Sequence, residues 1–169
     1  SRNILVVRQG SGTFLAPRPG VPDDPLGLTF LPRDRQMAVD LLDVRLMLEP
    51  EIAALAAERA GEGDVKRLET QCDRVEKLIR EERPYQEADV EFHRCVALAS
   101  GNRVVATLVP VIHSSAVLNI DLTRNELREN TLRSHRELVE AIRRKDPRSA
   151  RYAMIVHLAE NRRHLLGEN

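Results

Sequence analysis

The chain has 169 residues and a mass of 19.1 kDa, which is enough for one packed domain with an arm or a linker. Hydrophobic residues make up 42% and charged residues 31% of the chain, a balance that excludes a wholly disordered protein. The 26 basic side chains are balanced by 26 acidic ones, so any contact with nucleic acid must be local. Aromatic residues are only 3% of the chain, which favours helices over strands.

Cysteine usage and the length of apolar runs indicate the compartment. Cys72 and Cys95 form no CxxC pair, so we expect neither a disulfide framework nor a zinc ribbon. We expect a reducing compartment instead. No apolar stretch approaches the roughly 20 residues of a membrane span, and the N-terminus lacks a signal-peptide pattern. We therefore expect a cytoplasmic protein without membrane contact. The chain begins at Ser1 directly before a strand-like run, so we also expect it to be a fragment.

The first 33 residues predict a hairpin and a linker. Two β-prone runs, Ile4–Arg8 and Thr13–Leu15, flank a Gly10-Ser11-Gly12 turn and predict a β-hairpin over residues 1–16. Residues 17–33 are rich in proline, which blocks helices and favours an extended linker. Residues 34–169 form the predicted helical domain.

Helical periodicity continues almost from Asp34 to the end of the chain. It predicts an all-α fold, an antiparallel bundle of six to seven helices preceded by the β-hairpin. The first helix is expected near 35–60, ended by Gly61 and Gly63, and Asp64 is expected to cap the second. Further helices are expected with Pro84 in the first turn, from about 102 to 122, near 125–144, and after the Asp146-Pro147 cap.

Four polar side chains fall on faces that are otherwise apolar: Asp89, His93, His135 and His157. Asp89 and His93 are one helical turn apart, a spacing suited to holding one ion. If the three helices meet in the core, three imidazoles and one carboxylate converge there. Zinc is the first candidate for such a set, with nickel, cobalt or manganese as alternatives, because these cations accept nitrogen and oxygen ligands. The alternative interpretation is that these histidines are hydrogen-bonded core residues, and His113 and His164 are weaker candidates still.

Arg45 lies between Leu41, Leu42 and Leu48, where an apolar residue would be expected. A guanidinium that faces a cavity can clamp a carboxylate ligand. The alternative is a structural ion pair with Glu49, one turn further along the helix.

The common catalytic signatures, including GxSxG, HExxH, GxxxxGK and GxGxxG, do not occur in the sequence. No sequence motif indicates a nucleophile, so we expect a protein that is not an enzyme.

Several segments of the sequence, in the right order, carry a family resemblance. They are Val6–Leu15 and, in the helical part, Val44–Glu51 with Ala53–Ala57, Asp89–His93, Ala99–Asn102, Ser134–Ile142, and Ala150 through Met154 to His157 and Leu158. The first resembles the wing of a winged helix-turn-helix domain, and the others resemble the ligand-binding FCD domain in the FadR-like branch of the GntR superfamily of bacterial transcription regulators.

The resemblance implies a homodimeric, ligand-responsive DNA-binding regulator, with repression as the expected direction. Its effector domain would bind a small organic or sugar acid beside a divalent metal held by Asp89, His93, His135 and His157, with Arg45 gripping the effector. The three helices of the DNA-binding domain have no counterpart in this sequence. Arg8, Gln9 and Gly10 of the wing could still reach a minor groove or phosphates, which positions a protein without specifying sequence.

Two other functions remain open at this stage. A metal-dependent helical hydrolase could use the same four ligands to activate water. A dedicated metal sensor would respond to the ion itself.

Overall fold

The computed structural model describes residues 5–15, 31–32, 34–105 and 127–167. The chain divides into two compact units, residues 1–32 and residues 33–169. In the first unit, β1 (Leu5–Arg8) and β2 (Gly12–Leu15) form an antiparallel hairpin in which Leu5 lies opposite Leu15. Gly10 and Gly12 have φ angles of 79° and 103°, which explains why the turn contains glycine. The expected hairpin is therefore confirmed.

The second unit is entirely helical in its described part, so the all-α fold class is confirmed. It contains α1 (Arg35–Arg59), α2 (Glu62–Arg80), α3 (Gln86–Ala99), α5 (Arg128–Arg143) and α6 (Pro147–Leu166). Most of the helix expected between residues 102 and 122, together with His113, lies outside the described residues. Of the six to seven helices expected, five lie in the described ranges.

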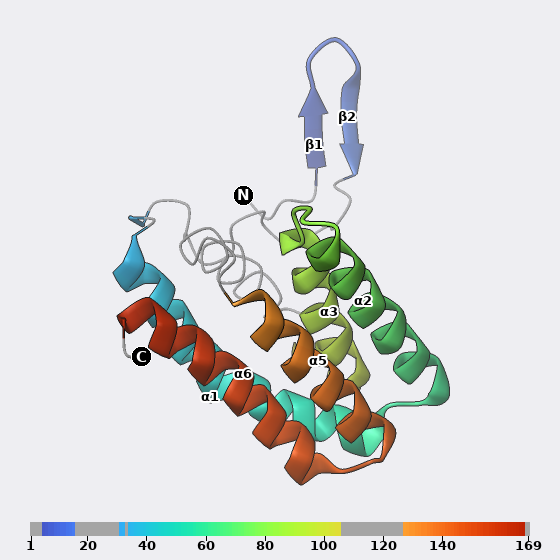
Figure 1. The fold of residues 1–169 in the computed structure, drawn as a ribbon. Helices are drawn as coiled ribbons and strands as arrows, with labels where there is room; N and C mark the ends of the chain where they lie inside the picture. The colour runs from blue at the N-terminus through green and yellow to red at the C-terminus, as the bar shows by residue number, and fades with distance from the viewer. Residues whose placement is uncertain (1–4, 16–30, 33, 106–126, 168–169) are drawn as a thin grey trace. The chain divides into compact units, whose positions relative to one another are not determined.

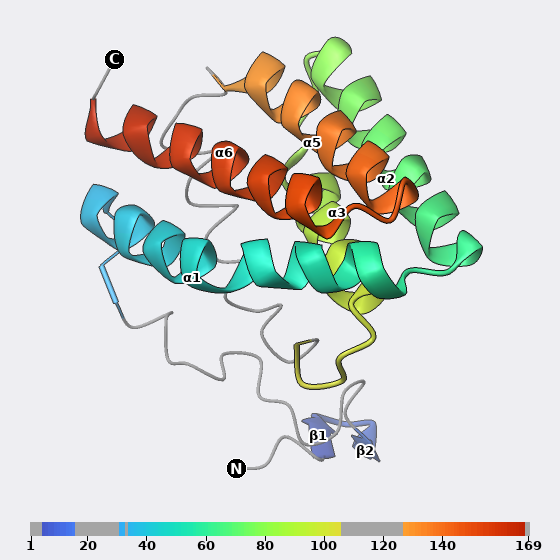
Figure 2. The ribbon, with the colours of Figure 1, turned by 90° about the horizontal axis from the view of Figure 1, so that it is seen from below.

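The long helices α1 and α6 lie side by side in opposite directions (Figures 1 and 2). Two ion pairs join the helices: Asp43 with Arg162 at 2.6 Å and Glu51 with Arg151 at 2.5 Å. Helix α5 lies between α6 and the α2–α3 pair (Figure 1). This arrangement brings α1, α3, α5 and α6 together around one interior.

The core of the described part is formed mainly by aliphatic side chains, with the aromatic rings of Tyr85 and Phe92 among them. Leu42, Leu68, Phe92, Leu138 and Met154 are almost completely inaccessible to solvent and come from the five different helices. Burying each of these side chains contributes roughly 1.5–3 kcal/mol to folding. No helix in the described part of the chain has the length and apolarity that a membrane span requires.

Several helix ends differ from the expectation by a few residues. The N-cap of α2 is Gly61, and Asp64 stands three residues later, where its carboxylate accepts the Gly61 N–H at 2.9 Å. Gly63 consequently lies inside α2 instead of ending α1. Pro84 precedes α3, which begins at Gln86. The Asp146-Pro147 start of α6 is confirmed, since the Asp146 side chain accepts two backbone N–H groups there.

Candidate metal and effector site

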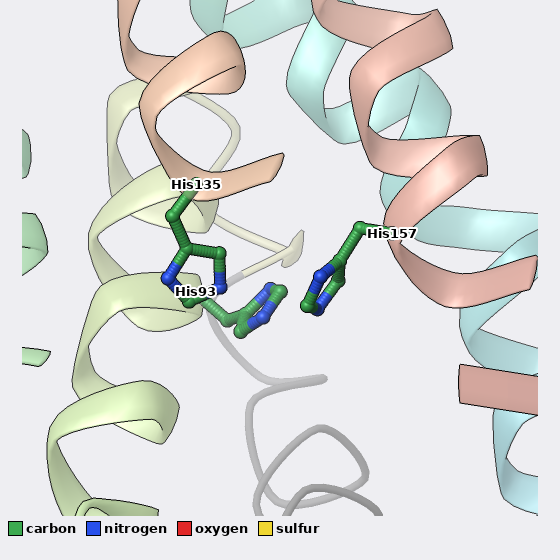
Figure 3. Close-up of side chains that lie close together, drawn as sticks. All are labelled: His93, His135 and His157. Carbon is green, nitrogen blue, oxygen red and sulfur yellow. The ribbon is translucent and has the colours of Figure 1, made fainter. Parts of the chain in front are cut away.

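Three buried histidines from three different helices face one another inside the bundle (Figure 3). His93 comes from α3, His135 from α5 and His157 from α6. Their ring centroids are 5.0 to 5.4 Å apart, and one nitrogen of each ring lies within 4.8 Å of the others. We call these three residues the histidine cluster.

Asp89 lies at the edge of the histidine cluster, one turn before His93 on α3. One carboxylate oxygen is 3.5 Å from His135 Nε2, and the other is 4.0 Å from His93 Nε2. These distances are longer than a good hydrogen bond, so the carboxylate faces the imidazoles without binding them directly. The structure thus brings together all four residues that the sequence nominated.

His135 makes no hydrogen bond in the described structure. Its side chain is 1% exposed, and neither Nδ1 nor Nε2 has a hydrogen-bond partner. Its ring stacks on Phe92 with centroids 4.0 Å apart. A buried polar group without a partner costs about 1–3 kcal/mol, so this imidazole is costly unless something binds its lone pair.

The donor set fits a transition-metal cation. Imidazole nitrogens and a carboxylate oxygen are typical ligands of zinc, at about 2.0–2.2 Å. Two such ligands around a tetrahedral ion are roughly 3.3 Å apart, whereas the nitrogens of the cluster are within 4.8 Å of one another. The rings would therefore need to approach one another by no more than about 1.5 Å.

A second buried group joins the cluster from α1. The Arg45 guanidinium forms an ion pair with Glu49, and both side chains are almost fully buried. The Glu49 Oε2 atom is 2.8 Å from His93 Nδ1, and Arg45 Nη2 is 3.2 Å from His93 Nε2. The ion pair considered for Arg45 in the sequence is thus present, and it also contacts a cluster histidine.

His157 is held by a neighbour on α5. Its Nδ1 atom is 2.8 Å from the hydroxyl of Ser134, whose oxygen also lies 2.8 Å from the Asn130 carbonyl. Ser134 and Glu49 were not singled out as site residues from the sequence. Glu49 could have been suspected, because an acidic residue four positions after Arg45 shares its inward face.

The protein environment favours neutral imidazoles. Burial, reinforced by the neighbouring histidines and Arg45, lowers the pKa of His135 well below its ordinary value. Burial also lowers the pKa of His157, with His93 and Arg45 acting in the same direction. Both rings are therefore neutral near pH 7, and a neutral imidazole keeps the lone pair that a metal requires.

The pKa values of the two carboxylates of the site are shifted in opposite directions from their ordinary values. Burial raises the pKa of Asp89, Glu49 acts in the same direction, and His93 and Arg45 only partly offset the rise. Burial acts on Glu49 in the same sense, but Arg45 and His93 together hold the pKa of that carboxyl below its usual range. Glu49 is therefore ionised in the protein alone, whereas Asp89 would be held ionised by a nearby cation.

The remaining candidates are not members of the histidine cluster. Gln9 and Gly10 are in the exposed turn of the hairpin, Arg8 ends β1, and all three belong to the first unit. His164 is in the last turn of α6.

Comparison with known proteins identifies relatives over most of the chain. A family model described as the FCD domain matches residues 40–160. A solved GntR structure from Streptococcus agalactiae is 38% identical with a TM-score of 0.84, and the match covers 96% of this chain and 76% of that one.

Two curated relatives are transcription regulators. The HTH-type transcriptional regulator YcbG of Bacillus subtilis is 30% identical over 70% of this chain and 50% of its own length. The galactonate operon transcriptional repressor of Escherichia coli is 27% identical over 98% of this chain and 75% of its own length. The chain thus spans between half and three quarters of the length of these two relatives.

Proposed function

Because the chain belongs to the FCD domain family of GntR-type transcription regulators, we propose that residues 34–169 are the effector-sensing and dimerisation domain of a DNA-binding repressor. The effector is a small organic or sugar acid that binds beside a divalent metal. One observation carries this proposal: three buried imidazoles converge beside a carboxylate, and one imidazole has no hydrogen-bond partner among the described residues.

In this proposal Asp89, His93, His135 and His157 hold the cation, with zinc first and nickel, manganese or cobalt as alternatives. The bound cation supplies a positive charge and a coordination position that an effector oxygen can take. Hydrogen bonding supports Nε2 as the ligand atom of two histidines, because Nδ1 of His93 contacts Glu49 and Nδ1 of His157 contacts Ser134.

The charges of the site favour an anionic effector. A dication and the Arg45 guanidinium would face two ionised carboxylates, Asp89 and Glu49, which leaves one positive charge in a buried place. A carboxylate effector neutralises that charge, whereas an uncharged analogue of the same shape does not. Arg45 is also within reach to pair with such a carboxylate, because it already contacts His93.

The position of the ligands on separate helices provides a route to DNA binding. Closing the histidine cluster around a cation and a carboxylate draws α3, α5 and α6 toward one another, and α6 is tied to α1 by two ion pairs. In a homodimer, such a shift changes the separation of two DNA-binding domains, and dimers that read two half-sites depend on that separation.

The hairpin contributes a minor DNA contact in this proposal. Arg8, Gln9 and the Gly10 backbone would touch phosphates or a minor groove, without reading bases in the major groove. We therefore expect this chain alone to bind operator DNA weakly or not at all, and an electrophoretic mobility shift assay checks this.

Elemental analysis of protein purified without chelators or nickel columns tests the proposed site. About one transition metal per chain is expected, together with its loss in a His135→Leu variant that remains folded. Protein that contains no metal and does not bind added zinc, nickel or manganese would refute the metal site.

Carboxylate titrations then distinguish the proposed regulator from the two other functions. Binding of a sugar acid by the metal-loaded protein, without turnover, supports the effector domain. Ester or amide hydrolysis by the loaded protein would indicate a hydrolase. Operator binding by the full-length regulator that depends on metal alone would indicate a metal sensor.

A further inference from the structure

The buried contact between Arg45, Glu49 and His93 fixes where the proton of His93 lies. A guanidinium can only donate hydrogen bonds, so His93 Nε2, 3.2 Å from Arg45 Nη2, must be the acceptor. In a neutral imidazole the other nitrogen then carries the proton. His93 Nδ1 therefore donates its N–H to Glu49 Oε2, 2.8 Å away.

Glu49 is the group that holds this arrangement together. It is 3% exposed, and it receives the Arg45 guanidinium on one side and the His93 ring on the other. It belongs to α1, whereas His93 belongs to α3, so the contact orients the ring from outside its own helix. A carboxylate that accepts the N–H of a metal-binding imidazole fixes its tautomer and increases its basicity.

We propose that Glu49 is a positioning residue that presents His93 Nε2 to a cation, and that Arg45 occupies this Nε2 until a cation takes it. The inference rests on the proposed metal site and adds two residues that are not ligands. Arg45 leaves Nε2 when the cation binds but stays tethered to Glu49 by its ion pair. A guanidinium N–H released in this way is available to a carboxylate effector, so the metal binds before the effector.

The first test reads the tautomer directly. Nitrogen NMR of ¹⁵N-histidine-labelled protein, with His93 assigned by comparison with a His93→Gln variant, distinguishes protonated from unprotonated ring nitrogens. We expect His93 with Nδ1 protonated in metal-free protein, and still protonated at Nδ1 after zinc is added, when Nε2 shifts. A His93 that is protonated at Nε2 without metal, or that binds zinc through Nδ1, would overturn the proposal.

The second test measures zinc affinity by competition with a chromophoric chelator. Glu49→Gln keeps the shape and an acceptor for Nδ1 but removes the charge, so zinc affinity should fall about 10- to 100-fold. Arg45→Gln can still donate to Glu49 but is too short to reach Nε2, so zinc affinity should rise about tenfold or more. A purely structural ion pair would change the thermal midpoint of both variants without moving the affinities in opposite directions.

Matched control variants come from an ion pair between α1 and α6. Asp43→Asn and Arg162→Gln remove the same charges from partially exposed positions, and zinc affinity should stay within about twofold of wild type. Zinc binding by wild type with unchanged affinity in Glu49→Gln and Arg45→Gln would overturn this inference and leave the proposed function intact. Failure of wild type to bind zinc would overturn both.

Discussion

Replacing His135 with leucine should reverse the order of stability between wild type and variant when zinc is added. His135 is buried, and both of its ring nitrogens lack hydrogen-bond partners in the described structure. Removing these polar atoms recovers about 1–3 kcal/mol of desolvation cost. Losing the ring stack on Phe92, with centroids 4.0 Å apart, costs about 0.5–1.5 kcal/mol.

The metal-free variant should therefore be more stable than wild type by about 1 kcal/mol, which raises the thermal midpoint by roughly 2–4 °C. Zinc at about 100 times its Kd stabilises a protein that binds it by about 2.7 kcal/mol. Wild type should then gain roughly 5–10 °C. The variant, which lacks one ligand, should gain almost nothing.

Thermal unfolding followed by circular dichroism, with chelator and with zinc, measures both effects. His164→Leu is the matched control, because His164 lies on α6 outside the histidine cluster, and it should retain the zinc-dependent gain. An equal gain from zinc in the His135 variant would show that His135 is not a ligand. A loss of several kcal/mol in chelator would show that His135 is a structural core residue.

Three further predictions concern packing, capping and thiol chemistry. Phe92→Ala removes a fully buried ring and should lower the free energy of unfolding by about 3–5 kcal/mol in urea titrations. Asp34→Ala removes the side chain that accepts the Met37 N–H at 2.9 Å, so α1 loses its N-cap. The free energy of unfolding should fall by about 1 kcal/mol. Burial raises the pKa of Cys72 and Cys95 to about 11, so less thiolate is present at any lower pH. Iodoacetamide at pH 8 should therefore modify the folded protein about 100-fold more slowly than the urea-unfolded chain, and an equal rate would contradict the burial argument.

The helical fold was predictable because its signals are local. The apolar stripes, the Gly-rich turn of the hairpin and the Asp146-Pro147 cap each act within a few residues, and each is found where the sequence indicates. The errors are local as well. Asp64 has the side chain of an N-cap, but Gly61 takes that position and Asp64 caps the helix from its first turn. An aspartate can accept backbone N–H groups either as the N-cap or from the first turn, so propensity alone does not separate the two arrangements.

The four nominated ligands were identifiable because polar side chains on apolar stripes contradict the pattern around them. Their convergence was not identifiable from spacing, since His93, His135 and His157 lie on three helices whose packing is set by the whole core. The family resemblance supplied that missing information in the sequence. The structure brings the three histidines together, with Asp89 beside His93 and His135, independently of that resemblance.

Glu49 shows why a residue that acts on another helix is not predictable from the sequence of its own helix. On α1 it pairs with Arg45 one turn away, and both side chains are buried. An ion pair leaves carboxylate lone pairs and guanidinium N–H groups to satisfy, and a buried pair must find partners for them. The two nitrogens of His93, on another helix, provide one acceptor and one donor. A buried ion pair next to an inward-facing histidine therefore indicates a carboxylate–histidine contact, because the carboxylate needs a donor, the guanidinium needs an acceptor, and a neutral imidazole supplies one of each.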